Sequence, residues 1–184
     1  MGNTQEENDW ISRSREGDHA SFEALIRMHQ QMIHSLTFRM TGSIADSKDL
    51  AQETFIRAYR QLGAYQGAAK FSSWLYRIAV NACLDWQRQE KRRGQLFANW
   101  NEAIDDAPTE CEEPVADDET SRKVQAALMK LPAKQRAAIV LTVYGEHTHG
   151  EAAKILGCSE TTVSWRLFAA RNKLKRLLRM EGKG

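Results

Sequence analysis

Residues 148–171, THGEAAKILGCSETTVSWRLFAAR, contain two helical patterns separated by a three-residue turn. Thr148 and Glu151 have the spacing of a capping box, in which a hydroxyl and a carboxylate bond the free amides at the start of a helix. Gly157 predicts the end of that helix, and Ser159 can cap a second one. The short turn between two capped helices predicts a helix-turn-helix, whose second helix can enter a DNA major groove.

The second helix of this pair presents polar side chains at its start and basic side chains further along. Its early residues can reach base edges in a major groove, and they are Ser159, Glu160, Thr161, Thr162, Ser164, Trp165 and Arg166. Arg171 and Lys175 follow and can contact phosphates, which adds affinity without sequence information. A helical hairpin with a solvated basic face is the alternative, and the turn length and both caps favour DNA binding.

The rest of the chain is predicted to be mainly helical, because apolar residues recur every three or four positions and almost no strand pattern occurs. Asp18 and Ser43 can cap two helices, the first of which ends at Gly42. Pro132 fits the first turn of a later helix. The expected helices cover residues 19–41, 43–62, 71–92, 121–130, 132–144, 148–156 and 159–179. We therefore expect an all-α fold with two small helical domains.

Charge is distributed unevenly along the 184 residues, whose net charge is +2. Residues 1–94 carry 13 basic and 11 acidic side chains, residues 95–121 carry nine acidic and no basic ones, and residues 122–184 carry 13 basic and four acidic ones. The middle segment also contains Pro108 and Pro114 and few large apolar residues, which is typical of a linker. We therefore expect one domain at 1–94, a flexible acidic linker, and a basic domain at 122–184 that binds nucleic acid.

Two further polar stretches lie in the first domain. Residues 71–77, FSSWLYR, place aromatic and basic side chains together, which suits unpaired bases that need stacking surfaces and charge neutralisation. The alternative is that these aromatic residues belong to the hydrophobic core. Asp49, Gln52 and Glu53 lie within one helical turn and form one polar patch, for which a solvated surface is the plainer interpretation.

The sequence disfavours several classes of protein and site. No apolar run approaches the ~20 residues of a membrane helix, and the polar start does not predict a secretory signal. Three distant cysteines predict ordinary thiols in a reducing cytosol, hence a cytoplasmic protein. No catalytic constellation or phosphate-binding glycine loop is evident, so we expect no enzyme, cofactor or small-molecule substrate. His147, His149 and Cys158 lack an evident fourth ligand, so no metal site is expected.

The order of these segments resembles the extracytoplasmic-function (ECF) sigma factors of the sigma-70 superfamily over nearly the whole chain. Residues 46–62, DSKDLAQETFIRAYRQL, are similar to region 2.2 of that family. Residues 70–88, KFSSWLYRIAVNACLDWQR, are similar to regions 2.3 and 2.4. Residues 131–145, LPAKQRAAIVLTVYG, and residues 151–177, EAAKILGCSETTVSWRLFAARNKLKRL, are similar to region 4.

This resemblance implies an alternative sigma factor, serving a stress or envelope response, that directs core RNA polymerase to promoter DNA. Core polymerase would be bound at the clamp helices of its largest subunit and the flap of its second-largest subunit. The residues implied to bind the core are Asp46, Asp49, Gln52, Glu53 and Phe55. Those implied to melt and read the −10 element are Lys70, Phe71, Ser72, Trp74, Tyr76, Arg77, Asn81, Asp85, Arg88 and Arg92. The helix-turn-helix would read the −35 element, and an anti-sigma factor, often membrane-bound in this family, would be the regulator.

The recognition helix departs from the pattern common in this family. Ser164 and Ala169 stand where basic side chains are frequent, and Trp165 is bulky. Two other classes of protein stay open as alternatives. A stand-alone repressor or activator would share only the helix-turn-helix and bind DNA as a dimer without polymerase. A nucleic-acid-processing enzyme would need catalytic groups, for which the sequence offers no candidates.

Overall fold

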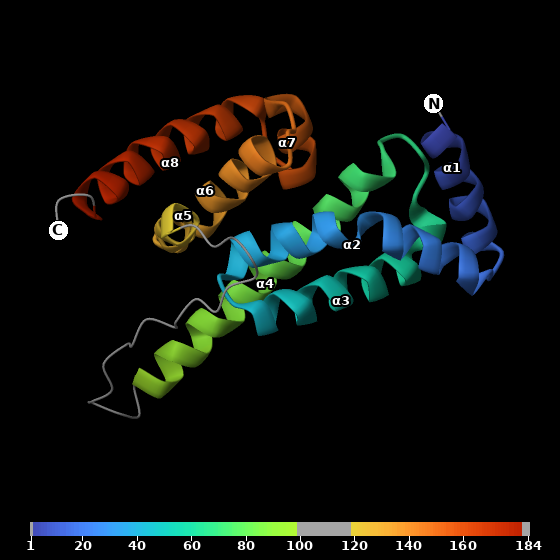
Figure 1. Ribbon diagram of the computed structural model, residues 1–184, viewed down its shortest axis with the longest axis horizontal. Helices are drawn as coiled ribbons and strands as arrows, with labels where there is room; N and C mark the ends of the chain where they lie inside the picture. The colour runs from blue at the N-terminus through green and yellow to red at the C-terminus, as the bar shows by residue number, and fades with distance from the viewer. Residues whose placement is uncertain (1, 99–118, 182–184) are drawn as a thin grey trace.

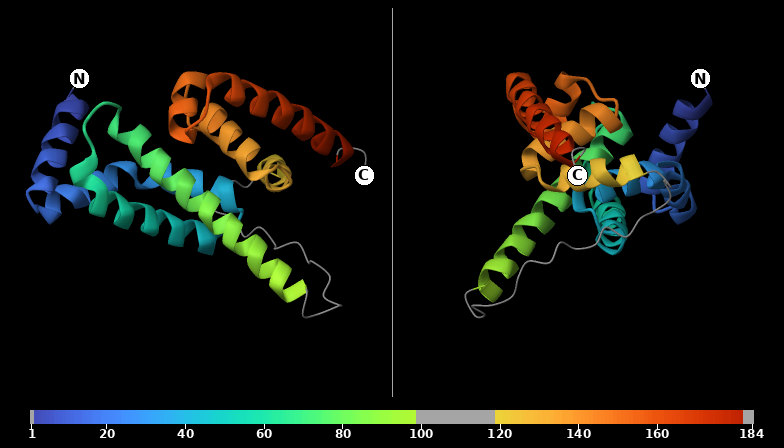
Figure 2. Two further views of the ribbon diagram at one scale, coloured as in Figure 1. Left: turned by 180° about the vertical axis from the view of Figure 1, so that it is seen from behind. Right: turned by 60° about the vertical axis from the view of Figure 1, so that its left-hand side comes forward.

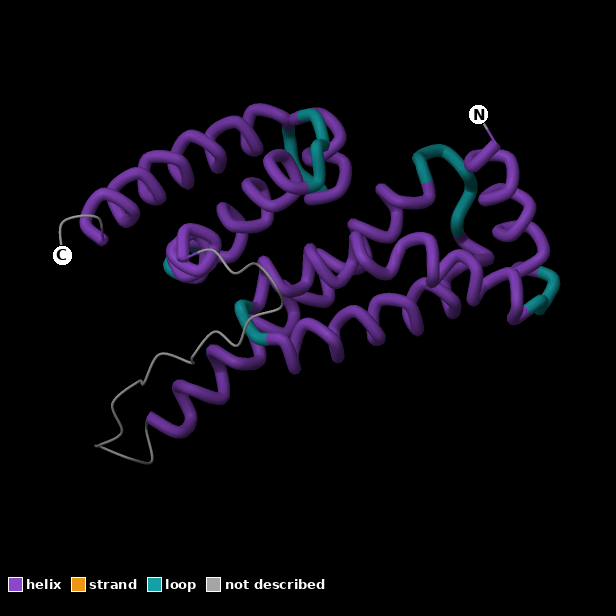
Figure 3. Tube along the Cα trace, in the orientation of Figure 1, coloured by secondary structure: helices purple, strands orange, loops and turns teal. Residues whose placement is uncertain are grey.

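A computed structural model of the chain describes residues 2–98 and 119–181, and its secondary structure there is entirely helical (Figures 1 and 3). The N-terminal bundle consists of α1 (Gly2–Arg15), α2 (His19–Thr41), α3 (Ile44–Gln61), the short 3-10 helix η1 (Leu62–Ala64) and α4 (Phe71–Ala98). The C-terminal bundle consists of α5 (Glu119–Met129), α6 (Ala133–Ile139), the π-helical turn η2 (Val140–Tyr144), α7 (His149–Leu156) and α8 (Glu160–Glu181). This architecture confirms the all-α fold.

The predicted caps set the helix boundaries of the N-terminal bundle. The Asp18 carboxylate accepts hydrogen bonds from two backbone amides at the start of α2, and the Ser43 hydroxyl accepts one at the start of α3. Gly42 ends α2 with a φ of 75°, a left-handed conformation that glycine adopts without strain. Within this bundle, apolar side chains such as Leu25 of α2 and Leu75 of α4 are almost fully buried.

Helix α1 was not predicted from its polar sequence, and it packs across α2. Ile11 of α1 is buried, and the Glu7 carboxylate of α1 lies 2.7 Å from His29 Nε2 on α2. Arg15 donates to the main-chain oxygens of Leu62 and Tyr65 in the chain that leads to α4. These contacts tie the start of the chain to the loop that precedes α4.

The C-terminal bundle contains the predicted helix-turn-helix. The Thr148 hydroxyl accepts from the Glu151 amide and the Glu151 carboxylate accepts from the Thr148 amide, which completes the capping box. The Glu151 carboxylate accepts from both the amide and the hydroxyl of Thr148, and these two hydrogen bonds hold the pKa of Glu151 below its ordinary value. Gly157, with a φ of 59°, ends α7, and the Ser159 hydroxyl accepts from the Thr162 amide at the start of α8.

Some predicted boundaries were wrong. The third expected helix continues past residue 92 to Ala98, because Gly94 alone does not interrupt a long α-helix. Helix α5 starts at Glu119, two residues before its expected start. The segment after Pro132 is not one α-helix, since Gly145 donates to the carbonyl of Val140, five residues earlier, and widens the last turn. Of the acidic segment expected at 95–121, residues 99–118 lie outside the described residues.

The two bundles pack against each other through one continuous hydrophobic core, so their helices lie side by side in every view (Figures 1 and 2). Helix α4 contacts α6 and α7, and α2 contacts α5, α6 and η2. The carboxyl-terminal part of α4 projects beyond both bundles (Figure 2). Within residues 2–98 and 119–181, no helix combines the length and hydropathy that crossing a membrane requires.

Candidate protein and nucleic-acid interfaces

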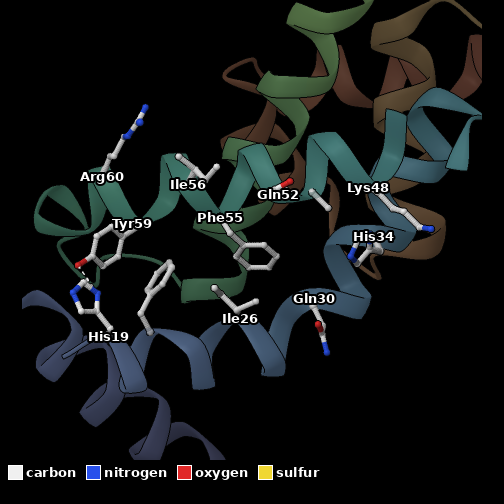
Figure 4. Close-up of a pocket in the computed structure, with 12 residues that line it drawn as sticks. His19, Ile26, Gln30, His34, Lys48, Gln52, Phe55, Ile56, Tyr59 and Arg60 are labelled. Atoms are coloured by element: carbon white, nitrogen blue, oxygen red, sulfur yellow. Dashed lines mark hydrogen bonds between the residues drawn. The ribbon is translucent and has the colours of Figure 1, made fainter. Parts of the chain in front are cut away.

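An apolar groove of about 480 Å³ runs between α2 and α3 on the face away from the C-terminal bundle (Figure 4). Phe22 and Phe55 line it as largely buried residues, whereas Ile56 is 41% exposed and Tyr59 is 37% exposed. Tyr59 packs edge-on against Phe22, with 4.9 Å between ring centroids, and its hydroxyl lies 3.1 Å from His19 Nδ1. The residues that line the groove are His19, Phe22, Ile26, Gln30, His34, Lys48, Ala51, Gln52, Phe55, Ile56, Tyr59 and Arg60. Large apolar side chains open to solvent in this way are typical of a protein interface.

The polar residues that the resemblance assigns to core binding lie on α3 beside this groove. Asp49 and Gln52 are exposed, and Gln52 lines the groove itself. Glu53 is half-buried and accepts a hydrogen bond of 2.7 Å from Arg57, so its carboxylate is already paired. Asp46 is also half-buried, in the first turn of α3. The predicted polar patch therefore borders an apolar surface that the sequence alone did not reveal.

The aromatic residues at the start of α4 form one cluster with the preceding loop. Phe71 is buried against Tyr65, with 5.4 Å between ring centroids, and Trp74 stacks obliquely on both at 5.3–5.4 Å. Phe71 thus belongs to the core, the alternative left open for it, while Trp74 and Ser72 are half-exposed. A cavity of about 610 Å³ opens beside Gly67–Ser72 and reaches His29. An aromatic wall and an adjoining cavity can receive an unstacked base.

Further along α4, the other candidate residues differ in accessibility. Arg77, Asn81, Arg88 and Arg92 are exposed, as is Lys70 in the preceding loop. Asp85 is paired with Arg88 at 2.5 Å and lies 3.7 Å from Arg57 of α3. Tyr76 is buried beneath the C-terminal bundle, and this burial raises the pKa of its hydroxyl.

Only some of the residues expected to face DNA are exposed on α8. Glu160, Thr161, Trp165, Arg171 and Lys175 are exposed, as is its cap Ser159, whereas Thr162 and Ser164 are half-buried. The Ser164 hydroxyl is 3.0 Å from His149 Nδ1, which braces α8 on α7. Arg166 is folded back, with its Nη1 donating to Cys158 Sγ at 3.4 Å, so it must change rotamer to reach a base.

Sequence reasoning missed Phe168, which is 68% exposed one helical turn after Trp165, itself 64% exposed. The i, i+3 spacing of two large aromatic residues was the available signal. The residues weighed for metal binding have separate partners: His147 packs on Tyr76, while His149 and Cys158 contact α8. Over the described parts of the chain, no three metal-binding side chains form a group.

Comparison with protein families matches both bundles. The family description of sigma-70 region 2 matches residues 25–93, and that of sigma-70 region 4 matches residues 121–174. The chain is 39% identical over 166 residues to the ECF RNA polymerase sigma factor SigM of Mycobacterium tuberculosis, covering 88% of this chain and 79% of that one. It is 33% identical over 178 residues to SigW of Bacillus subtilis, covering 92% and 95% of the two chains.

Solved structures show the same fold. The sigma factor RpoE of Bartonella quintana, crystallised with the anti-sigma factor NepR, superposes with a TM-score of 0.70 over 86% of this chain and 96% of that one, at 23% identity. CnrH, solved with the cytosolic domain of CnrY, superposes with a TM-score of 0.67 over 95% and 98%, at 24% identity. Since region 2, region 4 and full-length relatives all match in the same order, the chain belongs to the ECF sigma factors, which give RNA polymerase its promoter specificity.

Proposed function

We propose that the groove between α2 and α3 is the surface by which this sigma factor binds core RNA polymerase, and that the clamp helices of the largest subunit are its partner. The observation that carries this proposal is an apolar channel with Ile56 and Tyr59 open to solvent and Gln52 in its lining, while Asp49 is exposed three residues before Gln52 on α3. Such a surface suits a partner helix that has an apolar stripe flanked by charged side chains. The flap of the second-largest subunit is proposed to contact the C-terminal bundle.

The proposed −10 surface comprises Lys70, Trp74, Arg77 and Asn81, supported from within by Phe71. Melting a duplex requires no bond chemistry, because binding of unstacked bases offsets the lost pairing and stacking. The half-exposed indole of Trp74 offers a stacking surface, and the cations beside it can neutralise phosphates. Arg88 and Arg92 extend this basic face along the projecting part of α4.

The proposed −35 surface is the exposed side of α8, with α7 as its brace. Trp165 and Phe168 present apolar surface where thymine methyl groups line a major groove, and Arg171 and Lys175 lie further along for phosphates. This helix thus differs from a recognition helix that binds DNA through several basic side chains. We expect promoter recognition at these positions to depend more on DNA shape and on apolar contacts than on basic side chains.

The core-binding proposal is tested with Asp49→Lys and, separately, Ile56→Ser, each measured for affinity to core polymerase. Both residues are exposed on α3, so the fold should survive. We expect each change to weaken binding roughly tenfold, through like-charge contact in the first case and lost apolar contact in the second. Asp9→Lys makes the same charge change at an exposed site of α1 and should bind normally. Unchanged affinity of both groove variants would refute the assignment.

An anti-sigma factor is proposed as a second partner, in competition with the core. RpoE, which shares the fold, was solved with the anti-sigma factor NepR, and CnrH was solved with the cytosolic domain of CnrY. The same apolar groove with Ile56 and Tyr59 open to solvent can receive an amphipathic helix from such a regulator. We expect a purified regulator to compete with core polymerase for binding to the wild-type protein. It should compete less well for binding to Ile56→Ser.

A further inference from the structure

Helix α1 forms part of the wall of the cavity of about 610 Å³ beside the loop before α4. The residues that line this cavity are Glu7 and Asn8 of α1, Met28, His29 and Met32 of α2, and Tyr65 and Gly67–Ser72 of the chain that leads into α4. The family description of region 2 begins at residue 25, so α1 lies outside the part of the chain that it covers. What α1 adds to the cavity is therefore not described by that family match.

The position of α1 beside the cavity is fixed by contacts with the loop (Figure 1). The Arg15 guanidinium donates to the main-chain oxygens of Leu62 and Tyr65. It also lies 5.7 Å from the centre of the Tyr65 ring, whose hydroxyl donates to the Ala69 carbonyl at 2.7 Å. These contacts tie α1 to the loop that lines the cavity. Walls held in this way are what a site needs to discriminate between similar ligands.

A histidine holds one carboxylate at this wall. The Oε1 atom of Glu7 lies 2.7 Å from His29 Nε2, and the two side chains are 19% and 10% exposed. The His29 ring packs on Phe71 with 5.6 Å between ring centroids, so its orientation is set by the aromatic cluster. A carboxylate has two oxygens with about four lone pairs, so the bond to His29 leaves Glu7 able to accept from a ligand.

The cavity also offers hydrogen-bond donors and apolar faces. Lys70 only donates, and the Asn8 amide donates as well as accepts. Met28 and Met32 contribute polarisable thioethers, which pack well on flat rings. A flat ligand that offers a donor to Glu7 and acceptors to the neighbouring groups therefore fits this lining.

An unpaired base with an exocyclic amino group has this chemistry. Cytosine carries the group at N4 and adenine carries it at N6, and acidic side chains accept from cytosine N4 in protein–DNA complexes. Thymine has a carbonyl oxygen at the matching position, which would meet the Glu7 carboxylate as acceptor against acceptor. A site built to hydrogen-bond an amino group rejects a ligand that lacks it, because the polar group of the site then loses its partner.

We propose that Glu7 is a specificity-determining residue of this sigma factor, whose carboxylate accepts a hydrogen bond from the exocyclic amino group of one unpaired base of the −10 strand. His29 is the positioning residue that orients this carboxylate. Helix α1 thus takes part in reading promoter sequence. The assignment rests on the proposed −10 surface and adds to it the reading group and the chemistry of the base.

The test measures the affinity of holoenzyme for single strands that differ in one amino group. A −10 strand is first selected with wild-type holoenzyme from single strands randomised over the −10 element. Each cytosine or adenine is then replaced singly by uracil or hypoxanthine, which turns the amino group into a carbonyl and keeps the ring. We expect one such replacement to weaken binding by wild type at least roughly tenfold. If no replacement weakens binding, Glu7 reads no amino group.

The decisive variant is Glu7→Gln, which keeps the shape of the side chain and can still bond His29. Its amide both donates and accepts, so it can pair with an amino group or with a carbonyl. We expect this variant to bind the selected strand and its deaminated counterpart within about twofold of each other. Glu6→Gln removes the same charge from the adjacent exposed residue of α1, and it should keep the discrimination of wild type.

A role of Glu7 confined to holding α1 on α2 gives a different result. Glu7→Gln would then bind every strand less tightly and would keep the wild-type ratio between the two bases, which overturns the proposal. The positioning role is tested by His29→Leu, which cannot donate, and His29→Gln, which can. We expect discrimination to fall in the first variant and to be largely restored in the second, and equal discrimination in both overturns the role of His29.

Failure of the proposed −10 surface is recognised separately. Arg77→Ala and Asn81→Ala change exposed residues of α4 outside this cavity. Unchanged affinity of both variants for the selected strand means that the −10 surface is wrong. The ratio of affinities for the amino-bearing and deaminated strands, compared between wild type and Glu7→Gln, still decides whether Glu7 reads a base.

Discussion

The rings of Tyr76 and His147 meet edge-on at an interplanar angle of 85°, one on each side of the boundary between the two bundles. Tyr76 lies in the segment that resembles the −10-reading region, and His147 lies in the loop just before the helix-turn-helix. Nε2 of His147 is buried without a hydrogen-bond partner. A titratable ring thus lies within the contact between the two bundles.

Acidification should separate the two bundles through protonation of His147. Burial lowers the pKa of His147 below its ordinary value of 6.5, with Lys70 acting in the same direction and Glu151 against it, beside the neutral Tyr76. The arrangement with the bundles in contact therefore binds fewer protons than one in which they are apart. Its stability is fully present above about pH 6.5 and declines as the pH falls through the lowered pKa.

Small-angle X-ray scattering of the free protein between about pH 8 and pH 5 measures this opening as a rise in the radius of gyration. His147→Phe keeps a ring against Tyr76 but cannot titrate, and should remain compact across the range. The same expansion in that variant would mean that another group controls it.

Replacing Arg136 by Leu should destabilise the chain by roughly 3 kcal/mol, because main-chain carbonyls at the ends of α2 and α5 lose the buried guanidinium that donates to them. Burial lowers the pKa of the Arg136 guanidinium to about 10, so it stays charged at neutral pH. Urea unfolding measures the change. Lys134→Leu, at an exposed position of the same helix, should leave the midpoint nearly unchanged. Equal midpoints for the two variants would contradict a bridging role.

Asn81→Ala should impair opening of the −10 region and leave binding to −35 duplex unchanged. Asn81 is exposed on α4 beside Arg77, and its amide can read the edge of an unpaired base. Open-complex formation by holoenzyme on ordinary duplex measures the effect. Gln89→Ala, at another exposed amide of α4, serves as control. Normal opening by a folded Asn81 variant would remove this residue from the −10 surface.

Arg166 and Arg171 should contribute differently to −35 binding. They lie about 140° apart around α8, at ~100° per residue, so they cannot both point into the groove. Arg171→Ala should weaken all sequences alike and reduce the salt slope by about one. Arg166→Ala should cost roughly 1–3 kcal/mol and relax preference at one position if Arg166 leaves Cys158 for a base. Duplex affinity measured against salt and sequence separates the two, and identical profiles would exclude the division.

Local signals predicted the helices well where capping chemistry is strong. The sequence correctly predicted the caps at Asp18, Ser43 and Thr148 and the helix end at Gly157, because each acts through backbone groups next to it. Helix α1 was missed because its polar composition hides Ile11, which is buried only by contact with distant helices.

The candidate surfaces were predicted less completely, because periodicity reports which residues are buried but not what covers them. Tyr76 is covered by the other bundle rather than exposed for DNA. The groove between α2 and α3 needs side chains from two helices at once, so no single segment could reveal it. The resemblance supplied roles for individual residues, and their assignment to core, −10 and −35 contacts stays a prediction.

Gln125 and Arg136 of the C-terminal bundle donate across the boundary to main-chain oxygens at the end of α2, those of Phe38 and Met40. A substitution at either position changes the side chain and keeps the acceptor. Only substitutions at the donors Gln125 and Arg136, or a shift of the end of α2, can therefore change these hydrogen bonds during evolution. Substitutions in the two bundles should therefore co-vary only weakly at this contact, although the groups are directly hydrogen-bonded. A search for co-varying residue pairs would not detect it.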